Sequence, residues 1–182
     1  IVKYKIPLSP NQVSIISFVL GLISALLYVL GMPIPAAIMV QASSIIDGVD
    51  GELARLLGLT SRVGAFLDAI LDRFVDIAII ASLTYYVSTL GIIEAKLLVV
   101  VSMLALSGDL LVSYIHARGE ASLGVHPSRI GIIPNFSSRD VRLFIIFVGT
   151  LIGMYIETLI VVATLLSLIH ISEPTRLGMI SY

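Results

Sequence analysis

Cysteine is absent from this 182-residue chain. Without cysteine the protein has no disulfide framework, no thiolate nucleophile and no sulfur-based metal site. Charged residues are also scarce, because they make up 13% of the chain, against about a quarter in a soluble domain. The formal net charge is −1, so no bulk electrostatic field favours nucleic acid as a partner.

Hydrophobic residues are abundant instead. They form 58% of the chain, and the mean hydropathy is +1.08. The sequence contains no internal repeat and no low-complexity segment. These features predict an integral membrane protein with the lipid bilayer as a partner, and the length fits one domain of several spans.

Six segments carry the apolar residues. A spanning helix needs roughly 20 mostly apolar residues, so we predict an all-α integral membrane protein, a six-transmembrane-helix bundle whose last helix is truncated. The predicted spans are Val13–Leu30, Ile34–Leu57, Arg62–Leu90, Ile92–His116, Val141–Gly153 and a sixth from Tyr155 onward. Glycine, proline and serine between Arg118 and Asp140 predict a polar loop.

Basic residues are distributed unequally between the two ends of the predicted spans. Lys96 lies near one face. The other face or its boundary carries Lys3, Lys5, Arg55, Arg62, Arg118, Arg129, Arg139 and Arg142. Because basic loops stay in the cytoplasm, we predict a protein of the cell (plasma) membrane whose active site faces the cytoplasm.

Neither end of the given sequence is expected to be the natural end of the protein. The first residue is Ile1 and not methionine, so we expect further natural sequence upstream. The segment LSLIHISEPTR, Leu166 to Arg176, is the translation of a transposase adapter used in DNA sequencing libraries. We therefore expect residues 166–182 to be non-native read-through, and residues 1–165 to form the membrane domain.

Acidic residues gather in one block, residues 47–76. The block holds Asp47, Asp50, Glu52, Asp68, Asp72 and Asp76 against Arg55, Arg62 and Arg73. Salt bridges to the arginines are one explanation, and we expect Arg73 to pair with Asp76. Three cations against six acids leave that explanation incomplete.

The spacing of four of these acids predicts a metal site. Asp47 and Asp50 share a helix face, and Asp68 and Asp72 share a face of the next helix. An antiparallel hairpin sets the two pairs opposite each other, where like charges repel, more strongly in a partly dry setting. Two divalent cations would neutralise all four charges. Oxygen ligands suit Mg²⁺, Mn²⁺ or Ca²⁺.

Small residues accompany the acids. Gly48, Gly51 and Ala54 lie beside the first pair, and Gly64 precedes the second. Glycine costs up to about 1 kcal/mol relative to alanine within a helix, so its presence calls for a reason. Room for a ligand between the helices is one reason, and close helix packing in the membrane is the other.

Acids and small residues together resemble a family signature. The pattern Asp47-x-x-Asp50-Gly51-x-x-Ala54-Arg55, eight residues, Gly64-x-x-x-Asp68-x-x-x-Asp72 is similar to that of the CDP-alcohol phosphotransferases. The resemblance implies six spans, with the signature across the second and third. It also implies transfer of a substituted phosphoryl group from a CDP-alcohol to an acceptor alcohol, with release of CMP, and a homodimer.

The resemblance also implies roles for individual residues. It assigns Asp72 as the catalytic base that takes the proton of the attacking hydroxyl. It assigns two Mg²⁺ or Mn²⁺ ions to Asp47, Asp50, Asp68 and Asp72. It places around the CDP moiety Gly48, Asp50, Gly51, Ala54, Arg55, Gly64 and Asp68.

Arginines are candidates for binding an anionic acceptor, such as a phosphorylated polyol. The candidates are Arg118, Arg62, Arg139 and Arg142. Each can also be an ordinary anchor at the cytoplasmic face. Arg118 stands apart because SYxxAR is similar to the fourth-span pattern of the family. Asp109, inside the fourth predicted span, is either functional or a hydrogen-bonded structural residue.

Two stretches resemble an archaeal branch of the family, QASSIIDGVDGELARL and SSRDVRLFIIFVG. Bifunctional members of that branch carry a soluble cytidylyltransferase ahead of the membrane part. The resemblance implies a reaction of CDP-inositol with inositol phosphate. The alternative within the family is a phospholipid synthase with a CDP-linked lipid donor. An alternative of another class is a divalent cation transporter, although transporters usually place such acids near mid-membrane and show repeated halves.

Overall fold

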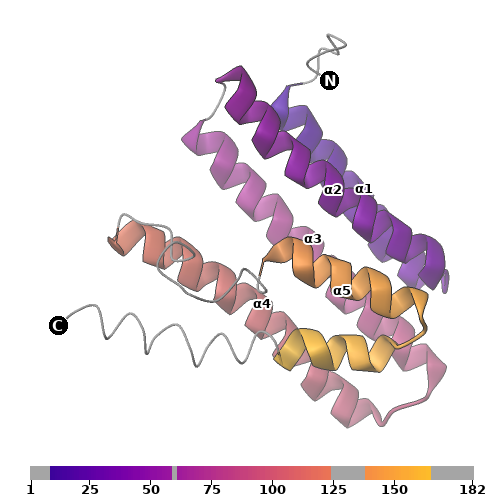
Figure 1. Cartoon of the computed structure of the whole chain (residues 1–182). Coiled ribbons are helices and arrows are strands. Elements are labelled where there is room, and N and C mark those ends of the chain that lie inside the picture. The colour runs from indigo at the N-terminus through magenta and orange to yellow at the C-terminus, as the bar shows by residue number, and fades with distance from the viewer. Residues whose placement is uncertain (1–8, 59–60, 124–137, 165–182) are drawn as a thin grey trace. The chain divides into compact units, whose positions relative to one another are not determined.

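Helices make up the part of the chain that the structure describes. The computed structural model describes residues 9–58, 61–123 and 138–164, and these ranges contain helices and turns but no strand (Figure 1). The helices are α1 (Pro10–Val29), α2 (Pro33–Leu57), α3 (Arg62–Leu90), α4 (Ala95–Leu123), α5 (Arg139–Leu151) and a further segment, Tyr155–Thr164. The predicted all-α fold is confirmed.

Two compact units divide the chain, Ile1–Tyr86 and Val87–Tyr182. The first unit contains α1, α2 and most of α3, and the second contains α4, α5 and the helix Tyr155–Thr164. Each unit is described by itself below.

Serine residues start several of these helices. Ser9 caps α1 in a capping box, in which its hydroxyl accepts from the Gln12 N–H and the Gln12 side chain accepts from the Ser9 N–H. The Ser61 hydroxyl accepts from the Gly64 N–H at 2.9 Å, and the Ser138 hydroxyl accepts from the Val141 N–H. Such caps satisfy backbone donors that the first helical turn leaves unpaired.

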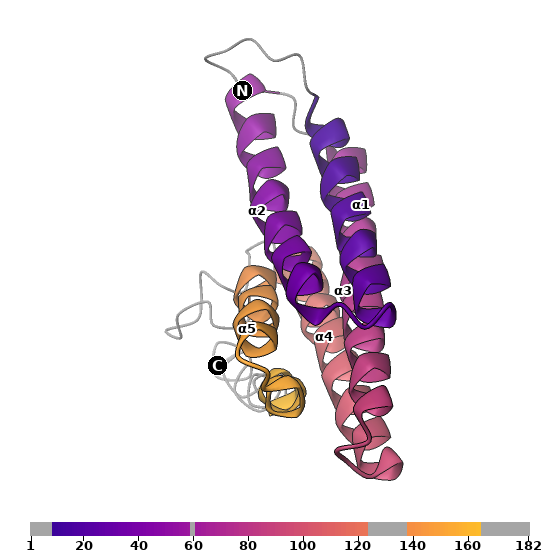
Figure 2. The same ribbon diagram turned by 90° about the vertical axis from the view of Figure 1, so that its right-hand side faces the viewer.

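A tight glycine turn joins α1 to α2. Gly31 has φ +74°, a left-handed conformation that glycine adopts without steric cost. The turn makes α1 and α2 antiparallel neighbours, which lie side by side in every view (Figure 2). The first helical residue of α2 is Pro33, where the missing N–H of proline removes no helical hydrogen bond.

All three helices of the first unit contact one another. Ser43 of α2 donates a hydrogen bond to the Ser17 carbonyl oxygen of α1 at 2.8 Å, and the Ser17 hydroxyl lies 3.1 Å from the Ser43 carbonyl oxygen. Gly21 of α1 lies so close to Val75 of α3 that an added Cβ would stand 2.4 Å from a Val75 methyl carbon. Small residues therefore let the backbones approach closely, as they do in membrane helices.

The faces of α1 are reversed relative to a helix of a soluble protein. Its buried face carries small and polar residues, including Ser17 (2% exposed) and Ser24 (0% exposed). Its outward face carries Val19, Leu22 and Leu26, of which Leu26 is 56% exposed. Soluble proteins rarely expose a continuous apolar face of this kind. The surface of α1 is suited to lipid.

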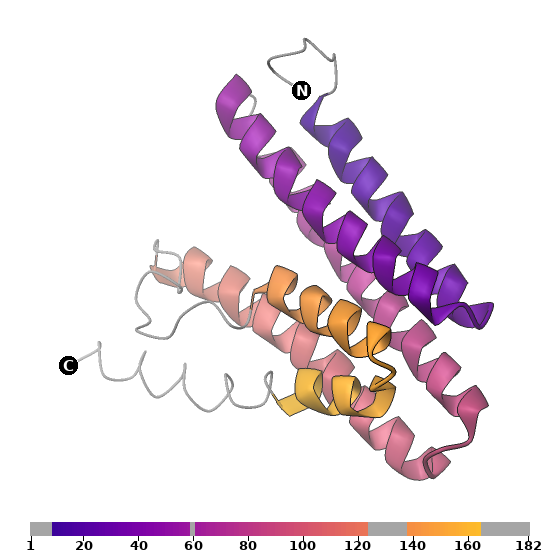
Figure 3. The same ribbon diagram turned by 45° about the vertical axis from the view of Figure 1, so that its right-hand side comes forward.

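The second unit is held by two different contacts. The Arg142 guanidinium of α5 lies 2.8 Å from the Asp109 carboxylate of α4. A turn at Gly153 then reverses the chain from α5 into the helix Tyr155–Thr164 (Figure 3). An added Cβ at Gly149 would overlap Thr158, so these two helices also depend on a small residue at their contact.

The observed helices correct the predicted fourth span. The span was predicted as Ile92–His116, but α4 begins at Ala95, because the left-handed Gly91 opens a turn before it. It also continues to Leu123, into residues that the sequence assigned to the polar loop.

The rest of the predicted loop up to residue 137, and the predicted read-through at residues 166–182, lie outside the described residues.

Among the described residues, two segments are long and apolar enough to cross a membrane by length and composition, Asn11–Val29 and Ala95–Tyr114. Neither segment lies in α2 or α3, the helices that carry the acids. The count of six spans stays a prediction.

Candidate active site

Three carboxylates converge in the first unit. Asp47 of α2 and Asp68 and Asp72 of α3 each offer an oxygen, and these oxygens lie within 4.8 Å of one another. All three side chains are half-buried. We refer to Asp47, Asp68 and Asp72 as the acid cluster.

Local sequence explains how the acid cluster forms. Asp68 and Asp72 are four residues apart, so α3 presents them on one face, one turn after the other. Gly58, with φ +63°, ends α2, and Ser61 starts α3, so only a short connection separates the two helices. The predicted hairpin thus brings Asp47 to the other two acids. Asp50 lies on α2 three residues later, but its side chain is outside the described residues.

The acid cluster fits a divalent cation. Two ionised carboxylates at 4.8 Å repel by roughly 3 kcal/mol at an effective dielectric constant of about 20. Opposite oxygens around one Mg²⁺ stand about 4.2 Å apart, twice its bond length of about 2.1 Å. The spacing and the oxygen-only donor set therefore match a hard cation, and a cation would offset the repulsion.

One arginine of the acidic block has a defined role. Arg73 forms an ion pair with Asp76 at 3.2 Å, as predicted, and Asp76 is 3% exposed. This pair lies one turn beyond Asp72 along α3. The side chains of Arg55 and Arg62, like that of Ala54, are outside the described residues.

The glycines near the acid cluster differ in their surroundings. A Cβ added at Gly48 would meet no heavy atom within 4 Å in the described part of the chain, so none of the described residues packs against this glycine. A Cβ added at Gly64 would stand 2.9 Å from the Ser61 hydroxyl and 3.5 Å from the Asn11 side-chain oxygen. Space for a ligand is thus available at Gly48. Gly51 is half-buried on α2.

Ser17 is a residue that the sequence did not single out. Its hydroxyl on α1 donates to the Asp47 carboxylate at 3.3 Å. The two residues are 30 positions apart, so neither helical spacing nor a local motif connects them. Only the packing of α1 against α2 reveals the contact.

The predicted acceptor arginines lie in different environments. Arg142 is 5% exposed and paired with Asp109, which is 2% exposed. Arg139 is half-buried on α5, and Arg118 is exposed on α4. The side chain of Arg62 is outside the described residues. Asp109 therefore has a structural partner, and binding of an acceptor by these arginines stays a prediction.

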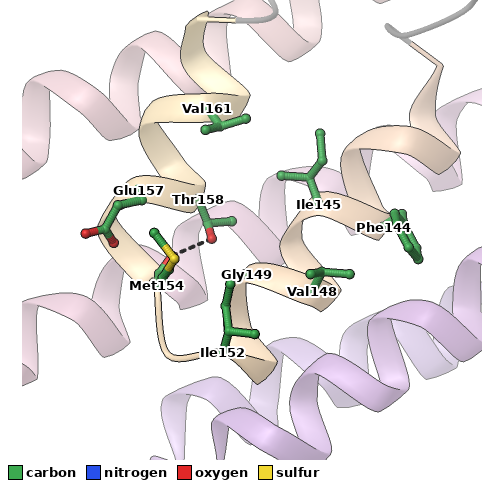
Figure 4. Close-up of a pocket in the computed structure, with 9 residues that line it drawn as sticks. All are labelled: Phe144, Ile145, Val148, Gly149, Ile152, Met154, Glu157, Thr158 and Val161. Atoms are coloured by element: carbon green, nitrogen blue, oxygen red, sulfur yellow. Dashed lines mark hydrogen bonds between the residues drawn. The ribbon is translucent and has the colours of Figure 1, made fainter.

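A cavity of about 260 Å³ lies between α5 and the helix Tyr155–Thr164 (Figure 4). Apolar side chains such as Val148, Ile152 and Val161 line it. The Thr158 hydroxyl at its wall donates to the Met154 carbonyl oxygen of its own helix. The cavity therefore offers few polar groups for phosphoryl chemistry.

A family model agrees with the resemblance that the acidic block suggested. The model of the CDP-alcohol phosphatidyltransferases matches residues 7–171. The chain belongs to this family. The predicted membership is therefore confirmed, and with it the assignment to a class of enzymes that transfer substituted phosphate groups.

Curated relatives are similar over most of the chain. The bifunctional IPC transferase and DIPP synthase of Rubrobacter xylanophilus is 44% identical over 147 residues, which are 81% of this chain and 32% of that protein. The archaetidylinositol phosphate synthase of Pyrococcus horikoshii is 32% identical over 158 residues, 84% of this chain and 77% of that protein. The chain thus spans about a third of the bifunctional relative.

Solved structures share the fold. The phosphatidylinositol phosphate synthase of Mycobacterium tuberculosis with CDP-DAG bound has a TM-score of 0.77 and 25% identity, covering 95% of this chain and 88% of that one. The same synthase in complex with manganese and citrate also has a TM-score of 0.77, and the match covers 84% of that chain.

Proposed function

We propose that this protein is a membrane enzyme that transfers a substituted phosphoryl group from a CDP-alcohol to the hydroxyl of an acceptor alcohol. The observation that supports the proposal most is the convergence of Asp47, Asp68 and Asp72 within 4.8 Å. These acids have the spacing of the signature that the sequence resembles, and they lie on α2 and α3.

In the proposed reaction, Asp72 accepts the proton of the attacking hydroxyl. The acceptor oxygen forms a bond to the phosphorus that carries the donor alcohol, and the bond from that phosphorus to CMP breaks. A carboxylate can act as this base when it reaches the hydroxyl. Asp47, Asp50, Asp68 and Asp72 would hold two Mg²⁺ or Mn²⁺ ions. Such ions, when bound, stabilise the entering and leaving oxygens of an in-line displacement.

The residues around the proposed CDP site have complementary tasks. Gly48 leaves open space beside the acids, which a nucleotide needs in order to approach the helix backbone. Arg55 would offset pyrophosphate charge with its planar donor fork. Gly51, Ala54 and Gly64 complete the small-residue side of this proposed site, with Asp50 and Asp68 contacting both nucleotide and metal.

For the acceptor we propose an inositol phosphate. The archaetidylinositol phosphate synthase and the phosphatidylinositol phosphate synthase both name an inositol phosphate product. A phosphate group on the acceptor suits arginine, which binds it with paired hydrogen bonds. Arg118, Arg62, Arg139 and Arg142 are the residues proposed for this task.

Two donors follow from the same comparisons. CDP-inositol would give a di-inositol product, as the resemblance to the bifunctional branch implies, and a CDP-linked lipid would give a phospholipid. The second donor is favoured by the archaetidylinositol phosphate synthase, of which this chain spans 77%. The proposal also includes six spans in the plasma membrane, a site that faces the cytoplasm and a homodimer.

CMP release from the purified protein tests the function. Inositol phosphate would be supplied with either CDP-inositol or a CDP-linked lipid, in Mg²⁺ and again in excess EDTA. We expect turnover with one donor, loss of turnover in EDTA, and recovery when Mg²⁺ or Mn²⁺ is restored. Proteoliposomes that carry divalent cations across the membrane without any CMP release would instead support the transporter.

A further inference from the structure

The hydroxyl of Ser17 links α1 to the acid cluster. Its oxygen lies 3.3 Å from Asp47 Oδ1, 3.1 Å from the Ser43 carbonyl oxygen and 3.4 Å from Ser43 Oγ. Ser17 is 2% exposed and Ser43 is 0% exposed. A buried hydroxyl in this position cannot exchange its protein acceptors for bulk water.

Several other serine and threonine hydroxyls donate within their own helix. Ser24, Ser82 and Thr84 each donate to a carbonyl three or four residues earlier in their own helix. That local bond is the usual solution for a hydroxyl within a helix. Ser17 donates to a neighbouring helix instead.

The protons of the two serines can be assigned. Ser43 Oγ donates to the Ser17 carbonyl at 2.8 Å, so its single proton is used there. Between the two hydroxyls, Ser43 can therefore only accept. The Ser17 proton then has a neutral carbonyl, a neutral hydroxyl and a carboxylate within reach. As a metal ligand Asp47 must be ionised, and an ionised acceptor forms the stronger bond, so in that state the Ser17 proton is directed to Asp47.

Asp47 is the member of the acid cluster that most needs such a restraint. Asp68 and Asp72 share α3, so the helix itself fixes their separation. Asp47 reaches them from α2, and its carboxylate must be oriented across the space between two helices. A carboxylate has about four lone-pair sites, so one bond from Ser17 leaves others for a cation.

We propose that Ser17 is a positioning residue that orients the Asp47 carboxylate for divalent cation binding. The inference rests on the proposed function, because it assumes that the acid cluster binds metal. Residues that hold a metal ligand in place typically change metal affinity or activity by about 10–100-fold when they are replaced. Ser17 would act through Asp47, without contact to either substrate.

Mn²⁺ binding to the purified full chain tests this role. The free ion would be counted by electron paramagnetic resonance in wild type, Ser17→Ala and Ser24→Ala. Ser24 is a matched control, because it is a 0% exposed serine on α1 whose hydroxyl donates to the Gly21 carbonyl. We expect Ser17→Ala to weaken Mn²⁺ binding by about 10-fold, and Ser24→Ala to leave it within about twofold.

A kinetic readout separates positioning from general damage. In Ser17→Ala the Mg²⁺ concentration for half-maximal turnover should rise by about 10-fold, with kcat largely recovered at saturating Mg²⁺. A structural defect would lower kcat at every Mg²⁺ concentration. Should Ser17→Ala not fold, Ser17→Cys keeps the size with a much weaker donor, and it should weaken Mn²⁺ binding in the same direction.

The outcomes distinguish this inference from the proposed function. If wild type binds Mn²⁺ and both alanine variants bind it equally well, Ser17 has no positioning role. Ser17 also has no positioning role if Ser17→Ala lowers kcat but leaves the Mg²⁺ concentration for half-maximal turnover unchanged. If wild type itself binds no Mn²⁺, the metal-dependent function fails, and the Ser17 inference falls with it.

Discussion

Two groups of charged side chains, one in each unit, handle charge in opposite ways. The acid cluster brings three carboxylates within 4.8 Å of one another, all of them half-buried. In the second unit, Asp109 lies 2.8 Å from Arg142, and both residues are at most 5% exposed. The acid cluster gathers negative charge at a partly exposed position, whereas Asp109 and Arg142 neutralise each other in a buried position.

The difference indicates what each group is for. A buried ion pair with equal charges is complete within the protein and has no need of a ligand, and separating it leaves a costly buried charge. Converging carboxylates at a partly open position gain stability from a cation that arrives from solution. The acid cluster therefore suits binding and release, whereas the Asp109–Arg142 pair suits a permanent contact between α4 and α5.

Replacement of Asp72 should have the largest effect. We expect Asp72→Asn to lower CMP release by about 1000-fold or more, because a general base contributes about 10²–10⁴-fold. Part of the Mn²⁺ and nucleotide binding should remain, since Asp47 and Asp68 are intact. Glu94→Gln is the control, because Glu94 is 71% exposed near Lys96. Near-normal turnover of Asp72→Asn would remove this residue as the base.

Replacement within the ion pair should affect stability first. Asp109→Asn leaves Arg142 buried without its counter-charge, at a cost of about 3–5 kcal/mol in the free energy of unfolding. Removing both charges, with Asp109→Leu and Arg142→Met, should recover most of that loss, because apolar replacement of a whole buried pair is often neutral. Denaturant unfolding in detergent measures both.

The double variant also sharpens the comparison. If it is stable and active, the pair is purely structural. If it is stable but its KM for inositol phosphate rises steeply, Arg142 also contacts the acceptor, as the sequence predicts. A double variant as unstable as Asp109→Asn would contradict the view that charge balance is what the pair provides.

Glycine substitutions should give the smallest effects, with opposite signs in two places. Gly21→Ala would press a methyl group against Val75, and overpacking of this kind costs about 1–3 kcal/mol. Gly48→Ala meets open space, so stability should hold or rise by up to about 1 kcal/mol from helix propensity. The KM for the CDP-alcohol should nevertheless rise in Gly48→Ala. An unchanged KM would remove Gly48 from the proposed nucleotide site.

Local spacing is what made the acid cluster predictable. The four-residue interval from Asp68 to Asp72 needs only a helix, and the short connection after Gly58 returns α3 beside α2. Ser17 and Asp109 could not be assigned in the same way. Their partners lie 30 or more positions away, so the contacts depend on how helices pack and rotate. The periodicity of the sequence does not predict how one helix is rotated against another.

Glycine carried an ambiguous signal. Gly21 and Gly48 both lie inside apolar helices. Val75 packs directly against Gly21, whereas Gly48 faces open space in the described part of the chain. The sequence also predicted a loop from Arg118, on the glycine, proline and serine residues between Arg118 and Asp140, whereas α4 continues to Leu123 through Gly119. A helix tolerates an isolated glycine for about 1 kcal/mol, and no proline follows Gly119 until Pro127.

The outward leucines and valines of α1 have a practical consequence for producing the protein. Lipid tails are as apolar as leucine, so these side chains add little to the association of helices in a bilayer. Val19, Leu22 and Leu26 are therefore positions where polar substitutions can be introduced to engineer a detergent-free variant. Ser17 and Gly21 on the opposite face would be left untouched, because they contact α2 and α3.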